Sequence, residues 1–214
     1  MIHNLITPGL TFDHASHRYA LDDHPLPGVT EIIKAANLVD YSHSDQLAIE
    51  RGNAVHAACH YLEEGDLDRS SLDPRIVGYV SAYERFTREC VAGSLISEAL
   101  LAHKTLRYAG TLDRICWLHD GGMVIPDWKT GGENPAFEIQ LAAYRMLIED
   151  NIGALGLRPC EIPSKWMIVR LHDDGRYSVQ GQKLSPARAR NLFIAALSTY
   201  SFRREFKLLP EEAA

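Results

Sequence analysis

Three consecutive strand-like segments in the middle of the chain constrain its fold more than any other feature. They span residues 94–104, 107–119 and 123–130. The turn sequence Asp120-Gly121-Gly122 joins the last two, which indicates a β-hairpin. A segment with apolar residues at helical spacing begins at Asp73-Pro74, before these strands, and another begins at Pro135, after them. This order predicts an α/β fold with a mixed central sheet flanked by helices.

Further elements extend this core at both ends. In chain order they are a β-hairpin over 10–29, a short helix capped by Thr30, a helix capped by Ser44 or Asp45 and ending near Glu64, a hairpin formed by 165–171 and 176–182, and a final helix capped by Ser185-Pro186. A chain of 214 residues that is 46% apolar can bury a real core, so we expect one domain. Its parts are an N-terminal hairpin and short helix (1–43), a core (44–182) and a C-terminal helix and tail (183–214).

Composition argues against several classes of protein. No apolar run approaches the ~18 residues that a membrane span needs, so we expect no membrane partner. Residues 1–12 lack the basic and apolar regions of an export signal, and we therefore expect a cytoplasmic protein. The cysteines lie apart without a C-x-x-C pair, which predicts reduced thiols and no zinc site or iron–sulfur cluster. They are Cys59, Cys90, Cys116 and Cys160.

The net charge of −6 is unevenly distributed along the sequence. Acidic residues gather early, between Glu63 and Asp68, whereas basic residues gather in the final helix between Lys183 and Lys207. Local fields decide whether a phosphate chain can approach a protein, so the net charge leaves nucleic-acid binding open.

Two aspartates and a lysine occupy unusual positions in the predicted strands. Asp113 interrupts an apolar strand, where an unpaired carboxylate would be costly to bury. Asp127 and Lys129 end the next strand on one face, because strand side chains alternate with a period of two. If the two strands are hairpin neighbours, Asp113 and Asp127 converge, and a metal ion between them would offset their repulsion.

The residue types suit Mg²⁺ or Mn²⁺, hard cations that prefer carboxylate, carbonyl and water oxygens. We expect Asp113, Asp127 and the main-chain carbonyl of Trp128 as ligands. One or two such ions could polarise a phosphodiester and activate water. Lys129 would position that water or neutralise charge on the phosphate, and the sequence leaves both roles open.

The ordinary alternative is that these residues form ion pairs on a sheet edge. Gly110-x-x-Asp113 and Asp127-x-Lys129 are each weak signals alone. Their order and strand placement carry the prediction, together with Gln140 and Tyr144, which lie four apart on the helix that follows.

This combination resembles the PD-(D/E)XK nucleases, specifically the RecB-like branch. There G-x-x-D, a D/E-x-K continued as Lys-Thr-Gly, and Q-x-x-x-Y occur in the same order, as here from Gly110 to Tyr144. The branch also carries an upstream G-x-x-x-H, which Gly52 to His56 matches. The hairpin ending in Leu26-Pro27-Gly28-Val29-Thr30 resembles the start of phage-type exonucleases of this superfamily.

The resemblance implies an αβββαβ core and a metal-dependent deoxyribonuclease. His56 would then be a metal ligand, and Glu98 an acidic residue near the metal. It favours an exonuclease of recombination, repair or phage DNA metabolism, in a bacterial cell or phage-infected host, with a separate recombination or replication partner. A structure- or sequence-specific endonuclease and a non-cutting DNA-binding or assembly module are the alternatives.

Several further residues are candidates for supporting or DNA-contacting roles. Gln140, Tyr144 and Thr130 would support Lys129 or touch DNA. Phosphate contacts could come from Arg51, Lys104, Arg107 and Arg114. Base stacking could come from Tyr19, Tyr41 and Tyr108. For His60, packing behind His56 is favoured over ligation.

Overall fold

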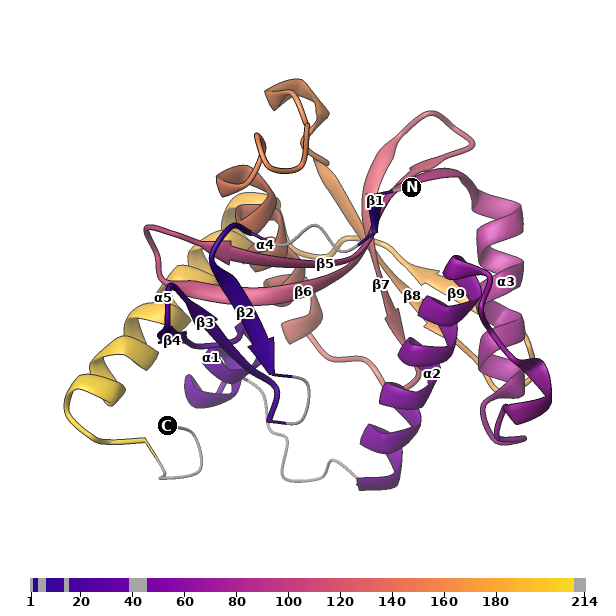
Figure 1. Cartoon of the computed structure of the whole chain (residues 1–214), viewed down its shortest axis with the longest axis horizontal. Coiled ribbons are helices and arrows are strands. Elements are labelled where there is room, and N and C mark those ends of the chain that lie inside the picture. Colours follow the sequence, from indigo (N-terminus) through magenta and orange to yellow (C-terminus); the bar gives the residue numbers. More distant parts are fainter. Residues whose placement is uncertain (1, 4–6, 14–15, 39–45, 210–214) are drawn as a thin grey trace.

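A computed structural model describes residues 2–3, 7–13, 16–38 and 46–209 of the protein (Figure 1). Its centre is a mixed six-stranded sheet in the order β1-β5-β6-β7-β8-β9. The strands are β1 (Ile2–His3), β5 (Val91–His103), β6 (Tyr108–Leu118), β7 (Met123–Lys129), β8 (Lys165–Leu171) and β9 (Tyr177–Gln180). Neighbours are antiparallel except β1–β5 and β7–β8, which are parallel, so the predicted α/β class and mixed sheet are confirmed.

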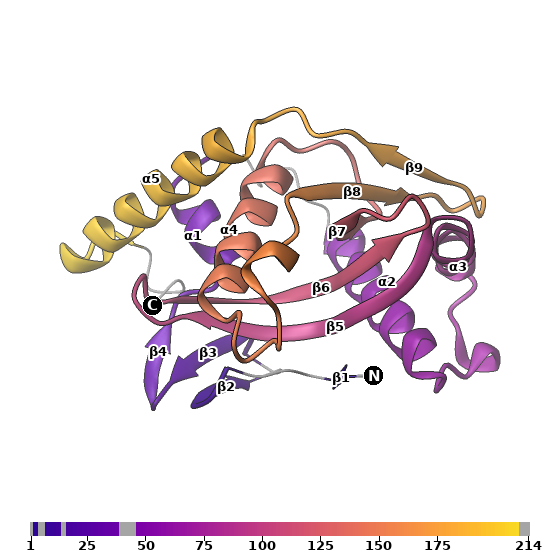
Figure 2. The same cartoon turned by 90° about the horizontal axis from the view of Figure 1, so that it is seen from above.

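Helices cover this sheet, and a small second sheet lies against one end of it. The helices are α1 (Val29–Ala35), α2 (Gln46–Glu64), α3 (Val77–Cys90), α4 (Ala136–Asp150) and α5 (Pro186–Glu205). Single 3-10 turns occupy η1 (Arg69–Ser71) and η2 (Pro159–Glu161). Seen from above, α1, α4 and α5 lie on one side of β5 and β6, and the small sheet lies on the other (Figure 2).

Two apolar clusters account for most of this packing. The larger one joins α1, α4 and α5 to the central sheet through residues such as Leu112, Leu141 and Phe193, all fully buried. The second joins α2 and α3 to the β7–β8 end and surrounds Trp128. The Trp128 ring contacts Tyr83 and Phe86 edge-on and is 3% exposed, so this side chain belongs to the core.

The N-terminal hairpin has one more strand than we predicted. The strands β2 (Leu10–Asp13), β3 (Arg18–Leu21) and β4 (His24–Leu26) form an antiparallel sheet. Asp22 and Asp23 make the extra turn with positive φ angles of 50° and 63°, a conformation that Asp tolerates better than most residues. The apolar face of this sheet packs on Ala102 and Ala109 of the central sheet.

Two predicted helix starts are wrong. Helix α1 begins one residue before Thr30, and Glu31 caps it by accepting a hydrogen bond from the Gly28 amide at 3.2 Å. Helix α3 begins at Val77, because the Asp73-Pro74 segment forms a separate turn in which Asp73 accepts from the Arg75 amide. The predicted Ser185 cap is confirmed, whereas Ser44 and Asp45 lie outside the described residues.

Candidate functional site

The candidate site occupies a split between β6 and β7. These strands pair only at Cys116–Val124 and Trp117–Met123, next to the Gly121 turn. Had the pairing continued, Asp113 would face Asp127 directly. Instead β7 leaves β6 and pairs with β8 from Val124 to Lys129. The separation gives room between the strands for the polar groups that both of them carry.

Asp113 reaches from β6 to the backbone of β7. Its Oδ2 atom accepts a hydrogen bond from the Trp128 amide at 3.3 Å, and its Oδ1 atom lies 3.5 Å from Nδ1 of His56. Burial by itself would raise the pKa of Asp113, but the charges of His56 and Lys129 outweigh burial and lower it. Asp113 is therefore held as a carboxylate in the apoprotein.

His56 approaches the same place from α2. Its Nε2 atom lies 3.0 Å from the main-chain oxygen of Trp128. Burial opposes protonation of the ring, but Asp113 outweighs it and raises the pKa of His56 to about 8. The His56 ring thus contacts both the Asp113 side chain on β6 and the Trp128 main chain on β7. Gly52, one turn earlier on α2, faces Thr130, whose hydroxyl an added Cβ would meet at an ordinary contact distance of 3.7 Å.

Asp127 is the most deeply buried carboxylate of the group. Its Oδ2 atom lies 2.7 Å from the Lys129 ammonium. The contact is one of charge, because Oδ2 is buried and receives no well-directed hydrogen bond among the described residues. Burial is the main reason that the pKa of Asp127 is raised, and the nearby Asp113 adds to it against the pull of Lys129. The pKa values of Asp113 and Asp127 thus shift in opposite directions.

Lys129 is held from the α4 side by a chain of polar contacts. Its ammonium donates to Gln140 Oε1 at 3.4 Å and lies 4.7 Å from the ring centre of Phe137. The Gln140 amide nitrogen in turn donates to the Tyr144 hydroxyl at 2.9 Å and to the Thr30 hydroxyl at 3.4 Å. The predicted support of Lys129 by Gln140 is direct, whereas Tyr144 acts through Gln140.

Gly110 has a steric role beneath this chain of contacts. An added Cβ there would lie 2.9 Å from the Tyr144 ring and 3.1 Å from Val29. Such distances force a neighbouring atom to move, so glycine lets α4 and Tyr144 lie close to β6. This contact gives a physical reason for the glycine that opens Gly110-x-x-Asp113.

Glu98 is the third carboxyl group of the site. It lies on β5 with a left-handed φ of 50°, which is unusual for a glutamate in a strand. Burial and then repulsion from Asp113 raise its pKa to about 8. Glu98 therefore carries a proton at neutral pH in the apoprotein, and a cation beside it would favour the ionised form.

The donors fit a hard divalent cation, although the described residues contain no ready-made cage of three or more His, Cys, Asp or Glu side chains. Two carboxylates and the Trp128 carbonyl are oxygen donors of the kind that Mg²⁺ and Mn²⁺ prefer. Asp127 Oδ2 is a buried carboxylate oxygen beside the Lys129 ammonium at 2.7 Å, and a carboxylate oxygen has lone pairs for a second partner. His56 already contacts both Asp113 and the Trp128 carbonyl. Water would complete the coordination, as is usual for Mg²⁺.

Arg51 lies at the edge of the site, whereas Arg114 is in the interior. The Arg51 guanidinium donates to the Thr130 carbonyl at 3.5 Å and stands over the Tyr79 ring. Arg114 is only 4% exposed and forms an ion pair with Glu63 at 2.6 Å. The expected phosphate contact of Arg114 therefore does not fit its position. It instead holds α2 to β6.

Other candidate residues lie away from the carboxylates or are inaccessible. Tyr108 is fully buried and Tyr19 is 4% exposed, so the expected base stacking by these two rings is wrong, while Tyr41 lies outside the described residues. His60 lies 3.7 Å from Glu64 on the same helix, so its expected packing behind His56 stays a prediction. Lys104 is exposed at the β5–β6 turn, beside Arg107.

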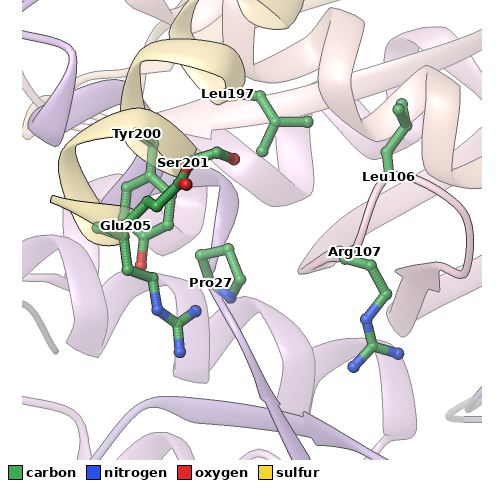
Figure 3. A pocket seen from close by; sticks show the side chains of 8 residues that line it. Pro27, Leu106, Arg107, Leu197, Tyr200, Ser201 and Glu205 are labelled. Carbon is green, nitrogen blue, oxygen red and sulfur yellow. The ribbon is translucent and has the colours of Figure 1, made fainter.

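Arg107 lines a shallow hollow of about 460 Å³ between this turn and α5. In Figure 3 its side chain stands on one side of the hollow, and Tyr200 and Glu205 stand on the other. Arg107 is six residues before Asp113, or about 20 Å away in an extended chain. The hollow is therefore separate from the candidate site.

Two contacts that shape the site have no signal in the sequence. The Tyr19 hydroxyl lies 3.0 Å from the Thr111 hydroxyl, and Arg114 joins Glu63, Tyr83 and Ser94 in one buried network. Both contacts link residues far apart in the chain, and no local spacing signals them.

Comparisons with known proteins add no assignment. No protein-family model matches the sequence, and no curated protein is significantly similar to it. Among the described residues, no helix combines the length and the apolar character that a bilayer crossing requires.

Proposed function

We propose that this protein is a metal-dependent deoxyribonuclease of the PD-(D/E)XK type that hydrolyses phosphodiester bonds at DNA ends. One observation carries the proposal. Asp113 and His56 meet at the β6–β7 split, where Asp127 contacts Lys129 at 2.7 Å. The order α3, β5, β6, β7, α4, β8 also agrees with the αβββαβ core of these nucleases.

Asp113, Asp127, the Trp128 carbonyl and His56 would hold Mg²⁺ or Mn²⁺, with Glu98 nearby. The bound ion would polarise the scissile phosphate and lower the pKa of a coordinated water. Each protein group has a defined part in this arrangement. The Trp128 amide and His56 orient Asp113, and Asp127 and Gln140 orient Lys129.

Lys129 acts on the phosphate itself. Water attacks phosphorus, the bond to the leaving sugar oxygen breaks, and negative charge grows on the phosphate oxygens. An ammonium fixed beforehand beside that charge stabilises the transition state without reorganising. Asp127 on one side and Gln140 on the other limit the motion of the Lys129 side chain, which supplies this preorganisation.

The preference for ends, and a role in recombination, repair or phage DNA metabolism, rest on the sequence resemblance. So does the expectation of a recombination or replication partner protein. The choice of DNA as the substrate rests on the same resemblance.

A cleavage assay tests the proposal. Purified protein with Mn²⁺ is given end-labelled linear DNA or a closed circle, beside Lys129→Ala and the control Lys165→Ala. Lys165 is an exposed lysine at the start of β8. We expect the wild type and Lys165→Ala to degrade the linear form alone, and Lys129→Ala to leave it intact. Nicking of the circle would favour an endonuclease, and inertness on linear, single-stranded and branched DNA would refute nuclease activity.

A further inference from the structure

An aromatic cluster lies at the end of the small N-terminal sheet. Phe12 on β2 stands directly opposite Tyr19 on β3, and their rings stack with centroids 4.6 Å apart and planes 29° apart. His17 meets both rings edge-on, at 5.0 Å from Phe12 and 5.8 Å from Tyr19. The three rings form one continuous unit, which we call the hairpin triad.

Tyr19 ties the hairpin triad to the floor of the candidate site. Its hydroxyl lies 3.0 Å from the Thr111 hydroxyl. Thr111 is two residues before Asp113 on β6, so strand alternation directs both side chains to the same side of the sheet. Burial raises the pKa of Tyr19, and Glu98 is close enough to add to the rise. The anchoring ring of the triad thus contacts β6 two residues before Asp113.

The members of the triad differ in access to solvent. Tyr19 is 4% exposed, which fits its role as the anchor. Phe12 is half-buried at the margin of the cluster formed by Leu10, Leu21 and Ala102, and His17 is exposed. His17 also adopts a left-handed φ of 53°, a conformation that costs free energy in a residue other than glycine. The outer edge of the triad is therefore aromatic, accessible and held by an anchored ring.

The small N-terminal sheet and α2 both approach β6 near the candidate site. In Figure 1 the β2–β3 hairpin crosses β5 and β6, and α2 lies further along β6. His56 on α2 and Tyr19 on β3 both contact β6, at Asp113 and Thr111 respectively. A DNA strand whose phosphate reached Asp113 would pass the triad with the adjoining nucleotides.

We propose that Phe12 and His17 form a stacking site for an unpaired nucleobase next to the scissile phosphate. This proposal rests on the proposed nuclease function and deepens it, because it names the substrate class as DNA with an unpaired terminal strand. Aromatic rings bind bases of any sequence, since every base has a π-face.

Stacking is measured directly with 2-aminopurine, a base whose fluorescence falls when it stacks. The probes are single-stranded oligonucleotides that carry 2-aminopurine at one end or the other. All proteins carry Lys129→Ala, so that the DNA stays intact. Variants on this background are Phe12→Leu, His17→Asn and the control Phe202→Leu. Phe202 contacts Phe206 with ring centroids 4.7 Å apart and planes 39° apart at the exposed end of α5, so the control removes an exposed paired ring elsewhere.

We expect quenching of one end probe by the Lys129→Ala protein and by the Phe202→Leu control. Phe12→Leu and His17→Asn should each weaken binding of that probe by about 5- to 100-fold, the usual effect of removing one base-stacking ring. Asn tolerates the left-handed backbone of residue 17, so His17→Asn tests the ring with the turn preserved. Thermal unfolding of each variant shows whether the fold persists. If Phe12→Leu fails to fold, the binding measured for His17→Asn alone tests the stacking site.

Unchanged binding in His17→Asn and in a folded Phe12→Leu would overturn the stacking site. Cleavage then separates the two proposals. In otherwise wild-type protein, we expect both variants to lose more rate on duplexes with single-stranded tails than on blunt duplexes. If the variants lose the same fraction of the cleavage rate on both kinds of duplex while the wild type cuts both, the stacking site is refuted. The proposed nuclease function is then unaffected. Absence of cleavage by the wild type, with quenching still present, would refute the nuclease alone.

Discussion

The imidazole of His56 lies 3.0 Å from the main-chain oxygen of Trp128 while its other nitrogen faces Asp113 at 3.5 Å. One helical side chain thus spans the split between two strands that stop pairing just before this point. Since the Trp128 amide also donates to Asp113, the three residues form a closed set of contacts. This set places a carboxylate, a carbonyl and an imidazole in one small volume.

Asp113→Ala should abolish Mn²⁺ binding, because it removes the carboxylate that the His56 and Trp128 contacts hold in place. Isothermal titration calorimetry of Mn²⁺ measures the effect. The control is Asp120→Ala, an exposed carboxylate in the β6–β7 turn that caps the Gly122 amide. Mn²⁺ affinity equal to that of the wild type in Asp113→Ala would show that the ligand assignment is wrong.

Lys129→Ala should separate binding from catalysis. We expect cleavage to fall by about 10²- to 10³-fold or more, as for other preorganised groups that stabilise transition-state charge. Mn²⁺ and DNA binding should persist, because the proposed ligands remain. Single-turnover cleavage and calorimetry on the same preparation test this. Loss of metal binding together with cleavage would mean that Lys129 maintains the site and does not act on the phosphate.

The stability of the apoprotein should fall as pH rises from about 6.5 to about 8. The folded-state pKa of His56 is raised to about 8 from an ordinary 6.5, so its stabilisation is complete below the unfolded value and lost above the folded one. Glu98, raised to about 8 from 4.5, contributes with the same sign over a wider range, because the folded state keeps its proton longer than the unfolded chain.

Urea unfolding at pH 6 and pH 9 measures this pH dependence. The His56 shift corresponds to about 2 kcal/mol at most. His56→Gln should reduce the difference between the two pH values, whereas the same substitution at His119, exposed beyond β6, should not. A pH dependence that His56→Gln leaves unaltered would contradict the assignment.

Glu63→Gln should destabilise the protein strongly, because it leaves the Arg114 guanidinium buried without its counter-charge. Removing one partner of a buried pair costs about 3–5 kcal/mol. Adding Arg114→Met should recover part of the loss. Chemical unfolding of both single variants and the double variant tests the coupling. Additive losses would show that the 2.6 Å contact between these residues contributes little.

A surface pair provides the comparison for this buried one. Arg75 and Asp73 form an exposed pair, and Asp73→Asn should leave the free energy of unfolding nearly unchanged, because exposed ion pairs contribute little to stability. A comparable loss in Asp73→Asn would indicate that burial is not what makes the Glu63–Arg114 pair important.

Local patterns in the sequence determined the class of fold and the candidate residues. Period-two alternation and the Asp120-Gly121-Gly122 turn sufficed to predict the β6–β7 hairpin, and helical spacing of apolar residues sufficed to predict α4. The motifs of the candidate site are short-range patterns that can be recognised without the fold. They span Gly110 to Asp113, Asp127 to Lys129, and Gln140 to Tyr144. The starts of α1 and α3 were misplaced, because Glu31 and the Asp73–Arg75 turn compete with the expected caps.

Tertiary structure alone decided which of these residues meet and which are hidden. The split between β6 and β7 arises because β7 pairs with β8, some forty residues later in the chain, and no spacing within the hairpin foretells it. Burial likewise separated Arg114, enclosed by α2 and α3, from the surface role that its charge suggested. The Tyr19–Thr111 contact joins residues 92 positions apart. Such contacts depend on the packing of whole elements, whereas the sequence records only the propensity of each element and the chemistry it carries.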